Sequence, residues 1–182
     1  MLRWDELEAR CESCTACPLY KTKNNCVFGV GNKNADLLFV GEAPGEWEDM
    51  QGEPFVGPAG KHLDRHLAAV GIDREDVYIA NILKCRPPKN RDPLPEEEDA
   101  CMEHLRAQIR LIDPKVIVCL GRIAAKRLIS PDFRITADHG KIYKKGKFTL
   151  LAVYHPSALL RDPSKNEAMY RDLKEVKKLL DK

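Results

Sequence analysis

The fold is decided by DLLFVGEAPGEWEDMQGEPF, residues 36–55. Its first five residues, 36–40, form a short apolar run that stops at a glycine, which predicts a buried strand. The residues after it, through 58, are rich in Gly, Pro and acids, so we expect a long loop there. A short strand that is apolar on both faces is typical of a parallel sheet covered on both sides.

Helices and strands alternate along the rest of the chain. Helical spacing of apolar residues predicts helices over 60–70, 96–112, 122–129 and 166–180, and a short amphipathic helix over 3–10. Apolar runs predict strands at 77–83 and 115–120, and a hairpin that pairs 141–143 with 148–154. This alternation predicts an α/β fold with a mainly parallel central sheet.

Three unusual segments fall at the carboxyl ends of predicted strands. They are the acidic loop after residue 40, Asn81 near the end of the second strand, and HPSALLRD at 155–162. Ligands of such sheets bind beyond the carboxyl ends of the strands. We therefore expect one site built from all three segments.

Length and composition point to a single globular domain spanning residues 1–182, because 182 residues can bury about 70% of their surface in one core. No apolar run approaches the roughly 18 residues of a membrane span. The first residues, MLRWDELEARC, carry acids where a signal peptide needs an apolar stretch. We expect a soluble cytoplasmic protein without membrane contact.

The net charge of +2 hides an uneven distribution. Residues 1–119 hold 15 Lys and Arg against 21 Asp and Glu, whereas residues 120–182 hold 15 against 7. A basic final third favours a face that binds a polyanion. A solvated C-terminal helix and a lysine-rich hairpin would explain the same charges without any partner.

Seven cysteines, an odd number with no secretory signal, favour metal or redox chemistry over a disulfide framework. Cys14 and Cys17 form a CxxC pair, and Cys85 and Cys101 are the other candidate ligands. Four thiolates can hold tetrahedral zinc or a 4Fe–4S cluster, and their spacing leaves both open. The remaining cysteines are a core thiol within an apolar run, Cys119, and the spare pair Cys11 and Cys26.

Together these segments resemble the family 4 uracil-DNA glycosylases, the iron–sulfur branch of their superfamily. The resemblance rests on CTAC at 14–17, GEAPGEWEDMQGEPFVGPAGKHL at 41–63, NILKCRPPKNRDPLP at 81–95, Cys101, LG at 120–121 and HPSALLRDP at 155–163. It implies a three-layer αβα sandwich with a four-stranded, mainly parallel central sheet. It also implies one 4Fe–4S cluster, held by Cys14, Cys17, Cys85 and Cys101, that ties residues 1–30 to the body.

The resemblance further implies excision of uracil from single- and double-stranded DNA, which leaves an abasic site for base excision repair. His155 would then donate a hydrogen bond to uracil O2 as negative charge develops on the leaving base. Asn81 would accept from uracil N3–H and donate to O4, a pattern that cytosine reverses. Phe55 would stack on the flipped base.

Gly41, Glu42, Ala43 and Gly45 would line the pocket for water and uracil. The best-known branch of the superfamily has an aspartate in place of Ala43 to position the attacking water, so another group must do this here. We expect Glu42 to orient the water. Glu48 would form a wall near uracil C5 that excludes thymine, although the acids of 42–49 would also suit a solvated loop.

Contacts to DNA are expected after the histidine and around Cys85. Leu159 and Leu160 would form an apolar wedge beside the basic Arg161, the combination that fills the gap left by an extruded base. The cations that flank Cys85 would meet phosphates: Lys84, Arg86 and Arg91.

Two other functions compete with this one. A relative that traps uracil covalently would need a basic loop ending in a nucleophilic histidine, and none of the five histidines follows an Arg-Arg run: 62, 66, 104, 139 and 155. A non-enzymatic iron–sulfur or zinc module, accessory to a polymerase or another nucleic-acid machine, would not need Phe55, Asn81 and His155 at strand ends. We expect a monomer whose partners are uracil-containing DNA and the product uracil, with a sliding clamp as a further candidate.

Overall fold

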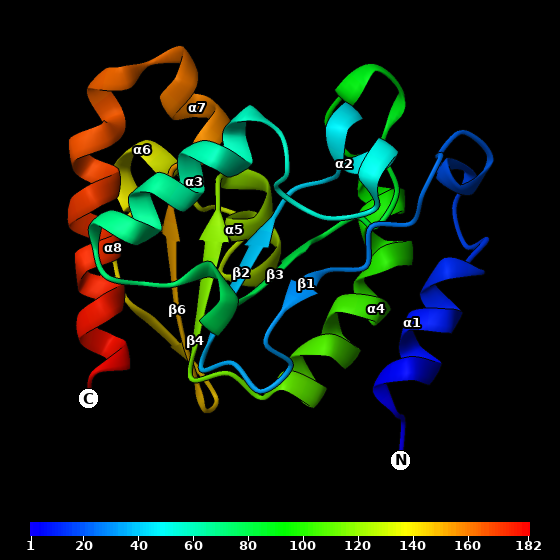
Figure 1. The fold of residues 1–182 in the computed structure, drawn as a ribbon, viewed down its shortest axis with the longest axis horizontal. Helices are drawn as coiled ribbons and strands as arrows, with labels where there is room; N and C mark the ends of the chain where they lie inside the picture. Colours follow the sequence, from blue (N-terminus) through cyan, green and yellow to red (C-terminus); the bar gives the residue numbers. More distant parts are fainter.

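A mixed sheet of six strands runs through the middle of the computed structural model, which describes residues 1–182 (Figure 1). In chain order the strands are β1 (Val30–Gly31), β2 (Leu37–Gly41), β3 (Tyr78–Asn81), β4 (Val116–Leu120), β5 (Tyr143–Lys145) and β6 (Phe148–Val153). Their spatial order is β1-β3-β2-β4-β6-β5. The central four pair in parallel, and the two edge strands pair antiparallel. The expected four-stranded parallel sheet is thus confirmed as the centre of a larger one.

Helices cover both faces of the sheet, which confirms the αβα layering. They are α1 (Trp4–Glu12), α2 (Glu46–Gln51), α3 (Pro58–Ala69), α4 (Pro95–Ile112), α5 (Arg122–Leu128), α6 (Ile135–Asp138), α7 (Pro156–Arg161) and α8 (Asn166–Leu180). Helices α3 and α8 lie on one side of the sheet and α4 on the other, with α1 packed outside α4 (Figure 1). None of the helices combines the length and apolar character that a membrane crossing requires.

Strand β2 shows why the sheet is buried on both faces. Leu38 and Val40 pack into the core beneath α4 and α5, while Leu37 and Phe39 pack into the core beneath α3 and α8. Successive side chains of a strand point to opposite faces, so an uninterrupted apolar run needs a helical layer on each side. Burial of a leucine side chain typically contributes about 1.5–3 kcal/mol.

The loop expected over 41–58 contains a helix, α2, so that expectation was wrong for residues 46–51. Its first turn carries Glu46, Glu48 and Asp49, which suit the positive end of a helix dipole. The Glu48 carboxylate also accepts the backbone N–H of Gly45, which closes the first turn. This helix has only six residues and is flanked by Gly and Pro, so the spacing of its apolar residues does not predict it.

Candidate active site

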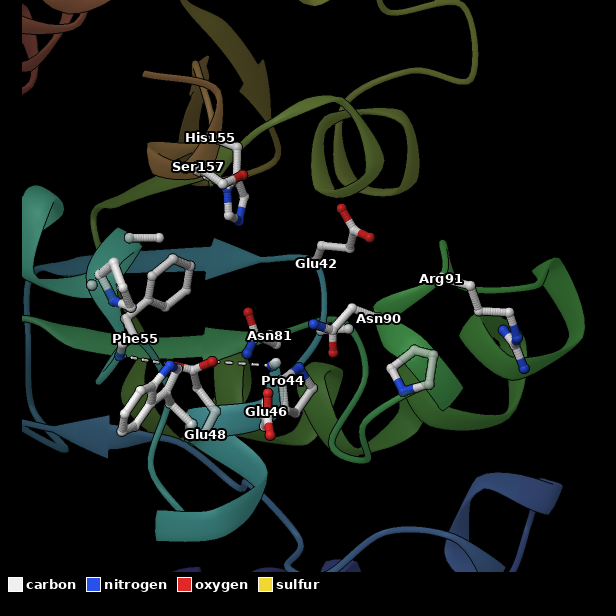
Figure 2. A pocket seen from close by; sticks show the side chains of 18 residues that line it. Glu42, Pro44, Glu46, Glu48, Phe55, Asn81, Asn90, Arg91, His155 and Ser157 are labelled. Atoms are coloured by element: carbon white, nitrogen blue, oxygen red, sulfur yellow. Dashed lines mark hydrogen bonds between the residues drawn. The ribbon is translucent and has the colours of Figure 1, made fainter. Parts of the chain in front are cut away.

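A pocket of about 360 Å³ opens at the carboxyl ends of the central strands. Gly41 and Asn81 end β2 and β3 and lie opposite each other in the parallel register, and His155 follows two residues after β6 ends. Figure 2 shows Asn81 and His155 extending into the pocket from different sides, with Phe55 and Glu42 flanking them. The three segments expected to form one site therefore do meet.

Seven of the eight residues expected to bind uracil line this pocket: Glu42, Ala43, Gly45, Glu48, Phe55, Asn81 and His155. The eighth, Gly41, lies directly behind it. A Cβ at Gly41 would be 2.5 Å from Asn81 Oδ1 and 2.6 Å from Phe55 Cζ. Any side chain there would displace both groups, so glycine is required by the close approach of its neighbours.

Asn81 has an unsatisfied polar atom. The residue is only 1% exposed, and its Oδ1 is the one buried side-chain oxygen or nitrogen without a hydrogen-bond partner. An unpaired buried acceptor typically costs about 1–3 kcal/mol, and native proteins keep few of them. Its own backbone is fixed, because the buried Lys84 Nζ donates to the Asn81 carbonyl at 3.1 Å. The side chain is therefore held ready to accept a donor from a ligand.

His155 is held in a defined protonation state. Its Nδ1 accepts the backbone N–H of Ser157 at 3.1 Å and lies 2.7 Å from Ser157 Oγ, so its proton is carried by Nε2. Burial, and next the positive charge of Arg161, lowers the pKa of His155 to about 4. At neutral pH the ring is therefore an uncharged donor whose N–H is not used by Ser157.

Phe55 adopts a left-handed backbone conformation, with φ of 54°. Its ring centroid lies 5.6 Å from that of His155, with the planes tilted by 36°. Arg74 holds this conformation by donating to the carbonyls of Phe55 at 2.8 Å and Pro54 at 2.7 Å. Gly60 also packs against it, since a Cβ there would be 1.8 Å from the Phe55 carbonyl oxygen. Such a conformation costs about 1–3 kcal/mol and persists only where its surroundings enforce it.

Of the three carboxylates that line the pocket, Glu46 is exposed, whereas Glu42 and Glu48 are half-buried in different surroundings. Burial, and next the charge of Asp92, raises the pKa of Glu42 to about 7, with Arg122 and Arg161 acting in the opposite direction. A group with a pKa near the working pH is suited to general-base chemistry.

Glu48 is committed to the loop instead. Its carboxylate accepts the backbone N–H groups of Gly45, Val56 and Gly57 at 2.8–3.1 Å. It therefore shapes one wall of the pocket through these hydrogen bonds. Its role against thymine stays a prediction.

Sequence reasoning missed several residues of the site. Trp47, Asn90 and Ser157 also line the pocket, as does Arg91, which was expected only as a phosphate contact. Arg74 supports the pocket from outside. Ser157 could have been found, because a serine two residues after a histidine can bond that ring when a helix begins between them. Arg74 carries no such signal, since it lies 19 residues from the carbonyl that it contacts.

Two residues expected to contact DNA are buried, so these two expectations were wrong. Leu159 is 1% exposed and packs into the core beneath α3 and α8, so it cannot enter DNA as a wedge. Leu160 is 45% exposed and Arg161 is exposed beside it, so both stay available. Lys84 is 1% exposed and donates to Phe28 O, Asn81 O and Gln108 Oε1, so it cannot meet phosphate.

A second recess contains the cysteines. Its walls include the four expected ligands and one spare cysteine: Cys14, Cys17, Cys85, Cys101 and Cys11. The backbone N–H of Lys84 donates to Cys101 Sγ at 3.3 Å. No group of three or more His, Cys, Asp or Glu side chains is arranged to hold a single metal ion. The expectation that Cys119 is a core thiol is confirmed, since it is fully buried.

Comparisons with known proteins agree with this fold and pocket. The model of the uracil DNA glycosylase superfamily matches residues 28–178. That range contains all six strands of the sheet and every residue that lines the pocket. The fold and the site thus define a member of this superfamily.

Relatives that match most of this chain narrow the assignment from the superfamily to one family within it. The chain is 48% identical to a type-4 uracil-DNA glycosylase of Archaeoglobus fulgidus, over 98% of this chain and 94% of the relative. It is 47% identical to one of Thermotoga maritima, over 93% and 88%, and 42% identical to one of Sulfurisphaera tokodaii, over 92% and 80%. The chain belongs to the type-4 uracil-DNA glycosylase family.

Proposed function

We propose that this chain hydrolyses the N-glycosidic bond between uracil and deoxyribose in DNA, leaving an abasic site for base excision repair. Membership of the type-4 family supports the reaction class. One structural observation carries the proposal for the site: Asn81 presents an unpaired buried acceptor in the same pocket as the donor His155.

Recognition begins when the uridine leaves the base stack, because the scissile bond is inaccessible inside a duplex. The flipped uracil stacks on Phe55, a contact worth about 1–3 kcal/mol in single-strand binders. Asn81 Oδ1 accepts uracil N3–H, and the Asn81 amide donates to O4. Cytosine offers an acceptor at N3 and a donor at C4, so it leaves both Asn81 groups mismatched.

Bond breakage leaves an oxocarbenium-like sugar and a uracil anion. His155 Nε2–H donates to O2, where the electron pair of the broken bond is delocalised. A preorganised donor of this kind typically lowers a barrier by about 2.7–4 kcal/mol. A water then adds to C1′ of the sugar, and the Glu42 carboxylate accepts the proton that this water loses. The raised pKa of Glu42 supports this assignment.

We further propose that Cys14, Cys17, Cys85 and Cys101 hold a 4Fe–4S cluster. The fit is supported by the recess that all four cysteines line. Four thiolates are a common ligand set for this cluster. When bound, the cluster would link the N-terminal segment, the residues after β3 and helix α4, so that residues 1–30 stay joined to the body.

DNA would reach the pocket across exposed residues near α7. Leu160 and Arg161 lie after His155, and Arg86 lies beside the cysteine recess, where its Nε donates to Asn90 Oδ1 at 2.7 Å. One chain contains every group used above, which supports action as a monomer. A sliding clamp remains a candidate partner.

An excision assay tests the proposal. Oligonucleotides with one uracil, single-stranded or paired with guanine or adenine, are incubated with the protein and then treated with alkali. We expect strand cleavage at the uracil in every substrate, and none when thymine or cytosine occupies that position. Binding of the uracil oligonucleotide without any abasic product would refute the hydrolase assignment.

A further inference from the structure

Two histidines and an asparagine meet on the side of the sheet away from the cysteines. His62 and His66 are one turn apart on α3, and Asn166 begins α8. These two helices lie against each other (Figure 1). All three side chains are half-buried, and none of them lines the uracil pocket.

The polar atoms of the three residues converge on one point. His62 Nε2 lies 3.0 Å from Asn166 Oδ1, His66 Nε2 lies 3.2 Å from the same oxygen, and the two ring nitrogens are 3.3 Å apart. A tetrahedral metal ion with ligands at about 2.0–2.1 Å keeps its donor atoms about 3.3 Å apart. The three separations therefore match one face of a metal coordination tetrahedron.

We propose that His62, His66 and Asn166 form a binding site for a divalent transition-metal ion such as Zn²⁺, which would join α3 to α8. Imidazole nitrogen is a preferred ligand of Zn²⁺, Ni²⁺ and Cu²⁺, and the amide oxygen completes a three-donor face. The site is separate from the cysteine recess and does not depend on the proposed glycosylase reaction.

The surroundings suit such an ion. Burial is the main cause that lowers the pKa of His66, with the neighbouring His62 and Arg65 acting in the same direction and the Asn166 hydrogen bond opposing them. This shift favours the neutral ring, the form that binds a metal ion. A shallow recess beside His66 and Asn166 also contains Glu167 and Tyr170, which leaves room for a water or a carboxylate as fourth ligand.

The competing explanation is a triad of hydrogen bonds. Both Nε2–H groups could donate to Asn166 Oδ1, which has two lone pairs. The two explanations differ in what they expect of a carboxylate at position 166. Asn166→Asp keeps the shape of the side chain and adds a charge that attracts a cation.

The test is calorimetric titration of ZnCl₂ into the full chain, purified anaerobically with any bound cluster intact. We expect one equivalent to bind. His62→Gln and His66→Gln should each weaken that binding by at least about 10–100-fold, the loss typical of an outer-shell partner alone. Asn166→Asp should tighten it. At a Zn²⁺ concentration 100-fold above Kd, the wild-type Tm should rise by about 5–10 °C.

His139→Gln is the matched control, because it removes a half-buried histidine that pairs with Asp172 elsewhere. It should bind Zn²⁺ as the wild type does. Equal affinity in wild type, His62→Gln and His66→Gln would place the ion elsewhere, for example on the cysteine pair. No binding in either the wild type or Asn166→Asp would leave the hydrogen-bonded triad as the correct explanation.

Discussion

Asn81 and His155 owe their chemistry to a few immediate neighbours. The Asn81 side chain has no partner of its own, while the Lys84 ammonium fixes its backbone. Ser157 occupies Nδ1 of His155, which leaves the Nε2–H for a ligand. In Asn81 the backbone carbonyl is bonded and the side chain is free for a ligand, and in His155 Nδ1 is bonded and Nε2–H is free.

Asn81→Asp tests base recognition. The aspartate cannot donate to uracil O4 and would repel the developing anion, so uracil excision should slow by at least about 10-fold, as loss of one hydrogen bond to a charged group implies. A carboxylate can accept from cytosine N4–H₂, so the ratio of cytosine to uracil excision should rise. Single-turnover rates on matched oligonucleotides measure both effects.

The control for this variant is Asn90→Asp, the same chemical change at another asparagine of the pocket. Arg86 Nε donates to Asn90 Oδ1, a bond that a carboxylate preserves. Its selectivity should equal that of the wild type. If Asn81→Asp also kept wild-type selectivity, Asn81 would not read the base.

The raised pKa of Glu42 predicts that the excision rate depends on pH. Its carboxyl has a pKa raised to about 7 by burial, so below that pH it is protonated and cannot accept the proton of the attacking water. The single-turnover rate should therefore rise with pH through about 7 and level off above it. His155 does not contribute to this transition, because its pKa of about 4 keeps it neutral throughout.

Glu42→Gln should lower the rate by about 10²–10⁴-fold, the usual contribution of a general base, and abolish the transition near pH 7. Glu46→Gln removes an exposed carboxylate of the same pocket and should retain the wild-type profile. A wild-type pH profile in Glu42→Gln would assign the transition to another group.

At the scale of elements, the segment from β2 to α3 forms one half of the pocket. Glu48 fixes its first turn and Arg74 fixes the conformation of Phe55 from the far side. Arg74 also pairs with Asp64 at 2.8 Å. Its guanidinium therefore links the Phe55 carbonyl to the middle of α3. Phe55, the residue proposed to stack on the base, is therefore supported from outside the pocket.

Arg74→Ala should release Phe55 from its left-handed conformation. Removing charged hydrogen bonds to two carbonyls should lower the Tm by about 4–8 °C, as a loss of about 2 kcal/mol implies for a chain of this length. The excision rate, measured well below the new Tm, should fall by about 10–100-fold because the ring is misplaced. Arg65→Ala, on the exposed side of α3, serves as control. A lower Tm with an unchanged rate would show that the clamp is only structural.

Most elements could be predicted because their patterns are strong. The buried runs in β2, β4 and β6 and the helical spacing in α3, α4 and α8 fell within a few residues of the expected bounds. Helices α2 and α7 are six residues long, too short for a helical period to be visible, and both start beside Gly or Pro. β1 has only two residues, and its partner in β3 is remote in sequence.

The candidate site was predictable where strand ends coincide with unusual segments. Asn81, His155 and Phe55 follow from that rule and from the family resemblance, whereas the φ of Phe55, the Arg74 clamp and the burial of Leu159 depend on packing across the fold. The sequence HPSALLRD does not show whether Leu159 or Leu160 faces the core, because the two leucines are adjacent and equally apolar. Tertiary contacts decide it.

At the scale of the molecule, Lys84 lies between the cysteine recess and the pocket. Its backbone N–H contacts Cys101 Sγ, and its side chain holds the carbonyl of Asn81. Residues that organise the cysteines therefore also support the end of β3. We therefore expect loss of the proposed cluster to disturb Asn81, the residue proposed to recognise the base.

Cysteine substitution tests this arrangement. Protein purified without oxygen should be brown and contain about four irons per chain. Cys14→Ala, Cys17→Ala, Cys85→Ala and Cys101→Ala should each lose the iron and become less soluble. Cys11→Ala and Cys26→Ala should keep it, although their sulfurs lie 3.2 Å apart in the same region. Colourless, zinc-loaded protein with full activity would contradict the cluster assignment.

The central claim is that uracil is released in the pocket where neutral His155 faces Asn81. The most direct measurement compares single-turnover excision and oligonucleotide binding for wild type, His155→Ala and the matched His139→Ala. The account predicts a rate about 10²–10³-fold lower for His155→Ala, with little change in binding and a wild-type rate for His139→Ala. A wild-type excision rate in His155→Ala would contradict it and would place the catalytic donor elsewhere.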